Sequence, residues 1–202
     1  MKSSSRNAAV WIARTAVLLA IAVLFQSLRL LIPVLAAIPV GPVTLDQLLI
    51  GSLVNLTLCV AAGMTGFWSG AVVGVLTPTI AFFEGALKFP LMIPFVALGN
   101  IAIVLFFWLF SRKITFKGSL YVGAVTGTIF KTAVLWFTVA LIAVPLLGVK
   151  AAAGQAIVLM FSWPQAITGA AGGILAAVIL PLIRKGTGEE GRRKRAEKVS
   201  AG

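Results

Sequence analysis

Residues 119–145 read SLYVGAVTGTIFKTAVLWFTVALIAVP, and Lys131 is the only charged residue in this apolar stretch. A helix of roughly 20 apolar residues crosses the hydrocarbon core of a bilayer, so this stretch is long enough to span a membrane. Further apolar stretches of this kind lie at residues 8–32, 45–64, 66–83, 90–110 and 154–183. We therefore predict six transmembrane helices.

The composition of the whole chain supports a membrane protein. Of its 202 residues, 60% are hydrophobic and 11% are charged, whereas about a quarter of the residues in a soluble domain are charged. Such a chain has too little polar surface to cover itself in water. We predict an all-α integral membrane protein with a transmembrane domain at 8–183, a short cytoplasmic N-terminus at 1–7 and a basic, disordered cytoplasmic tail at 184–202.

The basic residues predict how the six helices are oriented. One side of the membrane would carry Lys2, Arg6, Arg14, Arg112, Lys113, Lys117, Arg184, Lys185, Arg192, Arg193, Lys194, Arg195 and Lys198. The other side would carry only Arg29, Lys88 and Lys150. The positive-inside rule then places both termini in the cytoplasm. The net charge of +12 is thus explained by topology and by contact with membrane lipid, and we expect no nucleic-acid partner.

The residues that are missing exclude several kinds of chemistry. The chain has no histidine and a single cysteine, Cys59, which excludes histidine-ligated haem, histidine-dependent catalysis and the usual zinc sites. It has no phosphate-binding Walker motif. Asp46 and Glu84 are the only acidic residues before the tail, so no carboxylate cluster can hold a metal. We expect no enzymatic activity, no cofactor and no metal, which leaves binding, transport or scaffolding.

Lys131, Glu84 and Lys88 are the charged residues that most need an explanation. An ionisable group inside a membrane helix is costly, and for that reason it is a hypothesis about function. Lys131 would either face a cavity and pair with a substrate carboxylate, or serve as a structural partner of Glu84 or of a backbone carbonyl. Glu84 and Lys88 flank the connection after the third helix. They would either form a surface ion pair or line the mouth of an outward-facing pocket.

Three uncharged polar or aromatic residues are further candidates for binding. Asn100 follows Gly99 in the fourth helix and would contact either a ligand or a neighbouring helix. In the sixth helix, Pro164 predicts a kink. Trp163 and Gln165 beside it would then face a ligand cavity, unless the kink serves packing alone. We expect Asn55, in the second helix, to serve packing.

Small residues predict two close-packing helix surfaces. Ala16 and Ala20 in the first helix are four residues apart, and Ala9 and Ala13 have the same spacing. This spacing makes a smooth stripe that another helix can approach closely. A second set of small residues lies in the sixth helix, at Gly169, Gly172, Gly173 and Ala176.

Together these features resemble a known transporter family. The chain resembles the substrate-binding (S) subunit of energy-coupling factor (ECF) vitamin transporters. The similar features are the six helices, the segment Arg14-x-Ala16-x-x-x-Ala20, residues 51–55, 70–78 and 94–100, and Lys131. The resemblance covers roughly residues 13–184, and the overall pattern carries it rather than any single motif.

The resemblance implies a role and a set of partners. Such a subunit captures a vitamin or precursor at the outer face of the cell membrane of a prokaryote. It works with a transmembrane coupling subunit and two cytoplasmic ATPases, and is thought to topple in the membrane to release its substrate inside. By this resemblance Ala16 and Ala20 contact the coupling subunit, and the loop at 33–44 is a lid. The pocket would include Lys131, Asn100, Gln165, Trp163, Glu84 and Lys88.

The residues leave the substrate and two other function classes open. Lys131 and Lys88 favour a carboxylate, so a pantothenate-like compound is the leading candidate, beside hydroxymethylpyrimidine, folate-like and cobalamin-like substrates. A membrane scaffold similar to the rod-shape-determining subunit would share the topology, but would have no need of a polar cavity. A stand-alone secondary transporter would need internal repeats or a dimer, and no convincing repeat relates the two halves of the chain.

Overall fold

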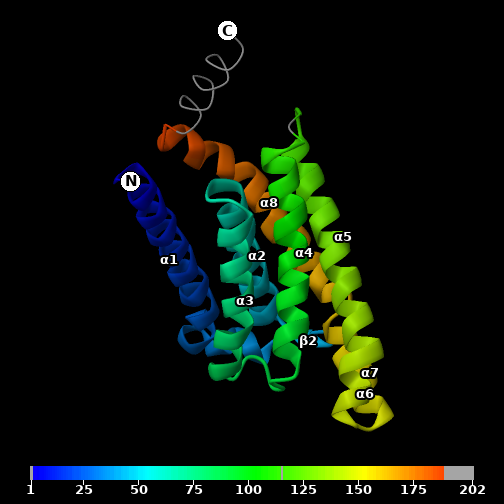
Figure 1. Ribbon diagram of the computed structural model, residues 1–202. Helices are drawn as coiled ribbons and strands as arrows, with labels where there is room; N and C mark the ends of the chain where they lie inside the picture. Colours follow the sequence, from blue (N-terminus) through cyan, green and yellow to red (C-terminus); the bar gives the residue numbers. More distant parts are fainter. Residues whose placement is uncertain (1, 115, 189–202) are drawn as a thin grey trace.

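The computed structural model describes residues 2–114 and 116–188, and most of them lie in a bundle of helices (Figure 1). The helical elements are α1 (Lys2–Leu31), η1 (Pro33–Ala37), α2 (Leu45–Met64), α3 (Phe67–Phe83), α4 (Met92–Arg112), α5 (Ser119–Thr138), η2 (Val139–Ala143), α6 (Val144–Leu147), α7 (Ala151–Met160) and α8 (Trp163–Gly186). Two short antiparallel strands, β1 (Pro39–Val40) and β2 (Val43–Thr44), form a hairpin. The predicted all-α architecture is confirmed.

The bundle contains the six expected membrane helices. By length and composition, five stretches of the described chain can cross a membrane: Asn7–Leu31, Leu45–Met64, Met92–Arg112, Ser119–Leu147 and Ala151–Gly186. The sixth, α3, is shorter at 17 residues and packs against α1, α2 and α4. The start of α1 and the end of α8 lie at one end of the bundle, which we call the terminal end (Figure 1). The hairpin lies at the opposite end, the hairpin end. That the terminal end faces the cytoplasm stays a prediction.

Two segments at the hairpin end have local structure that the sequence analysis did not specify. The loop at 33–44 contains the short helix η1 and the β1–β2 hairpin. The sixth span is broken rather than kinked: α7 ends at Met160, and α8 begins at Trp163 with Pro164 in its first two positions. A proline is readily accommodated there, since the first N–H groups of a helix have no partner within it.

The first and last helices extend beyond the apolar stretches from which they were predicted. Residues 2–7, expected to precede the first helix, are already part of α1, and α8 continues to Gly186. A helix can run beyond the apolar region because its backbone hydrogen bonds are internal wherever it lies. The remainder of the predicted basic tail, residues 189–202, lies outside the described residues.

The predicted glycine surface in the sixth span is confirmed as a close-packing surface between α8 and its neighbours. A Cβ atom on Gly172 would lie 2.3 Å from the backbone oxygen of Ser52 in α2, and one on Gly173 would lie 2.9 Å from Cβ of Ala124 in α5. Small residues let membrane helices approach at this distance, where dispersion between backbones stabilises the pair. This close approach brings α2, α5 and α8 together around the centre of the bundle.

Replacing Gly172 with alanine should destabilise the bundle. The new Cβ would meet backbone atoms, which cannot rotate away, so α2 and α8 would have to separate. We expect a loss of about 1–3 kcal/mol or more, measured as a lower thermal unfolding temperature of the detergent-purified protein. Gly186→Ala is the matched control, because nothing lies within 4 Å of the position that its new Cβ would take. Equal unfolding temperatures for the two variants would contradict the assigned packing.

Two arginines hold the terminal end of α2. Arg112 Nε and Arg184 Nη2 donate hydrogen bonds to the carbonyl of Gly63 at 3.0 and 2.7 Å, and Arg112 also donates to the carbonyl of Met64. The last carbonyls of a helix lack partners within it and carry the negative end of its dipole, so cations stabilise them. The arginines thereby connect the ends of α4 and α8 to α2.

Candidate functional site

Lys131 lies at the centre of a buried polar network. Its Nζ donates hydrogen bonds to Asn55 Oδ1 at 2.6 Å and to Asn100 Oδ1 at 2.9 Å, and the residue is 3% exposed. Neither partner carries a charge, and no ion pair to Lys131 occurs in the described part of the chain. An ammonium has three N–H donors, and the two asparagines take two of them. A protonated Lys131 would thus carry a charge that no carboxylate of the described residues neutralises.

A second set of hydrogen bonds fixes both asparagines. Asn55 Nδ2 donates to the Gly51 carbonyl at 2.8 Å and to Thr168 Oγ1 at 3.4 Å. Asn100 Nδ2 donates in the same way to the Gly74 carbonyl at 3.0 Å and to Thr77 Oγ1 at 3.4 Å. Residues of α2, α3, α4, α5 and α8 thus meet around one amine. A network in which every partner is itself held presents its central charge in a fixed position.

Trp163 and Gln165 connect this network to the hairpin. Both lie in the first turn of α8, and the Gln165 carbonyl accepts a hydrogen bond from Thr168 Oγ1 at 3.3 Å. Gly41, at the tip of the hairpin, has φ +64°, and a Cβ there would lie 2.9 Å from Cζ2 of Trp163. The hairpin tip therefore rests on the Trp163 ring. Four of the predicted binding residues, Lys131, Asn100, Gln165 and Trp163, share this part of the molecule.

Glu84 and Lys88 are not part of the network. Glu84 Oε1 accepts a hydrogen bond from Ser27 Oγ of α1 at 2.7 Å, while Lys88 is exposed. Within the described residues, these two side chains form no ion pair with each other and no hydrogen bond with Lys131. Glu84 is thus not the structural partner of Lys131, and the predicted surface ion pair does not form.

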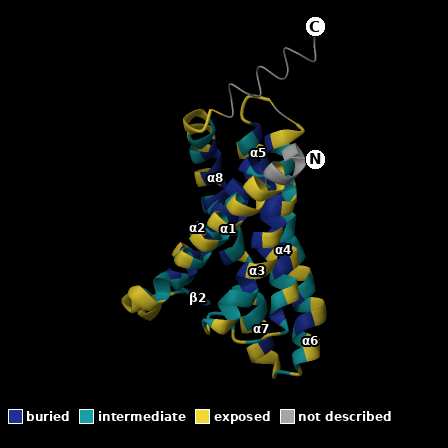
Figure 2. Cartoon of the chain, turned by 60° about the vertical axis from the view of Figure 1, so that its left-hand side comes forward, coloured by how far each residue is buried: buried dark blue, intermediate teal, exposed yellow. Residues whose placement is uncertain are grey.

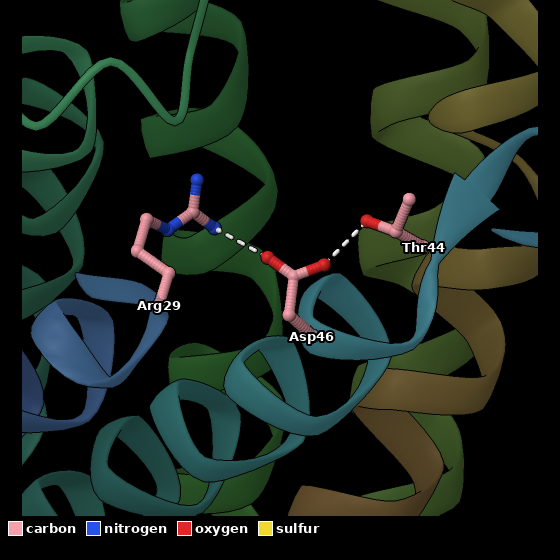
Figure 3. A network of polar contacts seen from close by, with 3 residues as sticks. All are labelled: Arg29, Thr44 and Asp46. Carbon is pink, nitrogen blue, oxygen red and sulfur yellow. Dashed lines mark hydrogen bonds and ion pairs between the residues drawn. The ribbon is translucent and has the colours of Figure 1, made fainter. Parts of the chain in front are cut away.

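A second polar network, which the sequence reasoning missed, lies at the base of the hairpin (Figure 3). Arg29 at the end of α1 and Asp46 at the start of α2 form an ion pair, with Nη2 and Oδ2 3.8 Å apart, and Thr44 Oγ1 donates a hydrogen bond to Asp46 Oδ1. The side chain of Arg29 is 18% exposed and that of Asp46 6%. The ion pair joins the two ends of the 33–44 segment, and so it ties down the base of the lid that the resemblance implies.

The void beside this ion pair is small. The void beside Arg29 and Asp46 has a volume of only about 10 Å³, room for about one water molecule. Arg29, which lines this void, has its Nε buried without a hydrogen-bond partner among the described residues. A void of this size is far smaller than the pockets that hold small-molecule ligands.

Replacing Asp46 with asparagine should loosen the hairpin. The change removes the charge that faces Arg29 and keeps the shape of the side chain, so the loss should be about 1 kcal/mol. This corresponds to a decrease of about 2–4 °C in unfolding temperature for a chain of this size, together with faster proteolysis within residues 33–44. Lys150→Gln, which removes an exposed charge at the same end, is the control. No difference between these variants would show that the pair does not restrain the hairpin.

Much of α1 is exposed or only partly buried (Figure 2), and its alanine stripe is on the exposed part. Ala16 and Ala20 are exposed, as are Ala9 and Ala13. The opposite face of α1 is anchored inside: Thr15 Oγ1 donates to Ser69 Oγ at 2.9 Å, and Gln26 Nε2 donates to the Thr77 carbonyl at 3.0 Å. The stripe is therefore open to a partner in the membrane.

Comparison with known proteins agrees with this geometry. Residues 11–184 match the family model described as "ECF transporter, substrate-specific component". No curated protein and no solved structure is significantly similar to the chain. The match includes most of α1 and α8 and all of the helices between them, with the Lys131 network and with Ala13, Ala16 and Ala20 of the alanine stripe. The chain therefore belongs to the family of substrate-specific components of ECF transporters, which are multi-pass membrane proteins that bind the substrate of a transporter.

Proposed function

We propose that this subunit captures a small vitamin or vitamin precursor at its hairpin end for ATP-driven uptake, and that the substrate is a carboxylate such as a pantothenate-like compound. The observation that supports a carboxylate is the Lys131 ammonium, which is held by two neutral amide oxygens in the middle of the membrane region. Burying an unpaired charge costs several kcal/mol. An anionic substrate offsets this cost, whereas a neutral substrate does not.

The same geometry supports a route for the substrate. Moving the hairpin off Trp163 would open the first turn of α8, where Gln165 leads toward Thr168 and the Lys131 network. In this proposal the substrate stacks on the Trp163 ring, the Gln165 amide hydrogen-bonds its polar groups, and its carboxylate takes the third N–H of Lys131. Glu84 and Lys88 would act farther out, at the mouth of the opened site. A mostly apolar wall with a few convergent polar groups is typical of small-molecule sites.

Release of the substrate would depend on partner proteins. In our proposal the exposed alanine stripe of α1 docks a transmembrane coupling subunit, which two cytoplasmic ATPases drive. The terminal end would then face the cytoplasm of a prokaryotic cell, as the basic residues predict. The chain itself contains no Walker motif, so ATP would be needed for uptake and not for binding.

An uptake experiment tests this division of labour. Cells that lack pantothenate uptake receive this chain alone, or together with a coupling subunit and two ATPases of the ECF type. We expect labelled pantothenate to accumulate only in the complete system, and the purified chain to bind it without ATP. Uptake by the chain alone would indicate a stand-alone transporter. Binding of no vitamin at all would favour a scaffold.

A further inference from the structure

A cleft of about 450 Å³ lies at the terminal end, away from the Lys131 network. It is formed between the start of α5 and the last turns of α8, and its lining includes Phe116, Ser119, Tyr121, Val178, Pro181 and Arg184. The proposed transport mechanism does not use these residues. Since Tyr121 and Val178 are each 48% exposed on the outside of the bundle, the cleft opens toward the surrounding membrane.

The cleft has a polar group without a partner at its inner side. Ser119 is only 6% exposed, and its hydroxyl makes no hydrogen bond with any residue that the structure describes. Ser119 is the first residue of α5, which follows Gly118 and has no side-chain cap. The N–H groups at the start of a helix and the positive end of its dipole attract anions. The hydroxyl of the largely buried Ser119 and the start of α5, which lacks a side-chain cap, therefore lie in the same cleft.

The charges around the cleft are all positive in the described chain. Five basic residues lie at this end: Arg112, Lys113, Lys117, Arg184 and Lys185. The carboxylates of the described residues, Asp46 and Glu84, lie at or near the hairpin end. Arg112 and Arg184 hold the end of α2, and Lys113 lies over the Trp108 ring at 5.9 Å. Lys117, next to two lining residues, is exposed and makes no ion pair or hydrogen bond with a described residue. It is the cation best placed to attract an anionic ligand.

We propose that this cleft binds an anionic phospholipid from the membrane leaflet at the terminal end. The lipid phosphate would accept hydrogen bonds from Ser119 Oγ and from the N–H of Leu120, since the N–H groups of Ser119 and Tyr121 already donate to the carbonyls of Phe116 and Gly118. Lys117 would supply the charge that selects an anionic headgroup. An acyl chain would lie along Tyr121, Val178 and Pro181. The cleft's polar inner side and apolar, membrane-facing wall match an amphiphile better than a free anion, and basic pockets between membrane helices are known to bind anionic lipid headgroups.

Native mass spectrometry of the full chain in detergent tests this proposal. Phosphatidylglycerol and phosphatidylcholine with identical acyl chains are added at equal concentration. We expect one retained phosphatidylglycerol per chain, weak retention of phosphatidylcholine, and about a fivefold loss of retention in Lys117→Gln and in Ser119→Ala. Lys150→Gln, which removes a charge at the hairpin end, should retain the lipid like the original chain. Both test positions tolerate the change without a cavity, so each variant should fold.

Any of four outcomes would overturn the assignment. Equal retention of the two lipids would show that the cleft does not select an anion. Unchanged retention of phosphatidylglycerol in both Lys117→Gln and Ser119→Ala would place the lipid elsewhere. If inorganic phosphate displaced the lipid at equal concentration, the site would be one for free phosphate. Loss of co-purification with a coupling subunit in these variants, with lipid retention unchanged, would instead make the cleft a protein contact.

Discussion

Lys131→Ala should abolish substrate binding by the purified chain. The variant removes the charge that is proposed to face the substrate carboxylate, and it leaves the oxygens of Asn55 and Asn100 without their donor. Truncating one member of a buried, hydrogen-bonded charge pair costs about 2–5 kcal/mol. The dissociation constant for a pantothenate-like ligand should therefore rise at least about thirtyfold, measured by titration calorimetry in detergent.

Two further variants separate binding from folding. Lys150→Ala removes an exposed lysine at the hairpin end and should leave the affinity unchanged. Asn55→Leu keeps the Lys131 charge but removes one of its two partners, so it should weaken binding less than Lys131→Ala does. If Lys131→Ala binds the ligand as well as the original chain does, the carboxylate proposal fails, and a lower unfolding temperature of this variant would then make the lysine a structural residue.

Tryptophan at both Ala16 and Ala20 should abolish ATP-driven uptake and spare binding. Both alanines are exposed on the outer face of α1, so two large rings would hold a partner helix away without touching the Lys131 network. Loss of close helix packing in a membrane removes the dispersion contacts that drive association. Uptake in cells with all partner subunits should fall to the level without the coupling subunit, while the affinity of the purified chain stays within about twofold.

The matched control for this double variant is Val125→Trp. Val125 is 49% exposed on α5, across the bundle from α1 (Figure 1). The control should bind the substrate and support its uptake as well as the original chain does, because it changes a surface that faces lipid alone in our proposal. Normal uptake by the Ala16→Trp/Ala20→Trp chain would show that the coupling subunit docks elsewhere, and lost binding would show that α1 shapes the site.

The sequence predicted the fold because lipid imposes strong limits on it. Six apolar stretches of sufficient length and one-sided basic residues left few alternatives, and the α8 glycines indicated where helices meet closely. Helix boundaries were less accurate, since residues 2–7 continue α1 and the sixth span breaks at residues 161–162. A proline indicates a disturbed helix, but it does not say whether the helix bends or starts again.

The centre of the site was predictable in part. Lys131 and Asn100 stood out because polar groups inside a membrane helix need a partner, and the structure joins them directly. Asn55 was assigned to packing, and its hydrogen bond to Lys131 was not predicted, because helical phase did not indicate which way Lys131 points in a fifth helix that is apolar nearly all round. The ion pair of Arg29 with Asp46 was missed for another reason: it forms only when the intervening hairpin folds back and brings the ends of α1 and α2 together.

Thermal unfolding of the detergent-purified chain across a panel of water-soluble vitamins and precursors tests the central claim most directly. A ligand at 1,000 times its dissociation constant adds about 4 kcal/mol of apparent stability, or roughly 8–16 °C for a chain of this size. The proposal predicts one clear stabilising ligand that carries a carboxylate, and no shift with that ligand in Lys131→Ala. A flat panel would contradict vitamin capture, and a neutral ligand that stabilises both chains equally would contradict the role of Lys131.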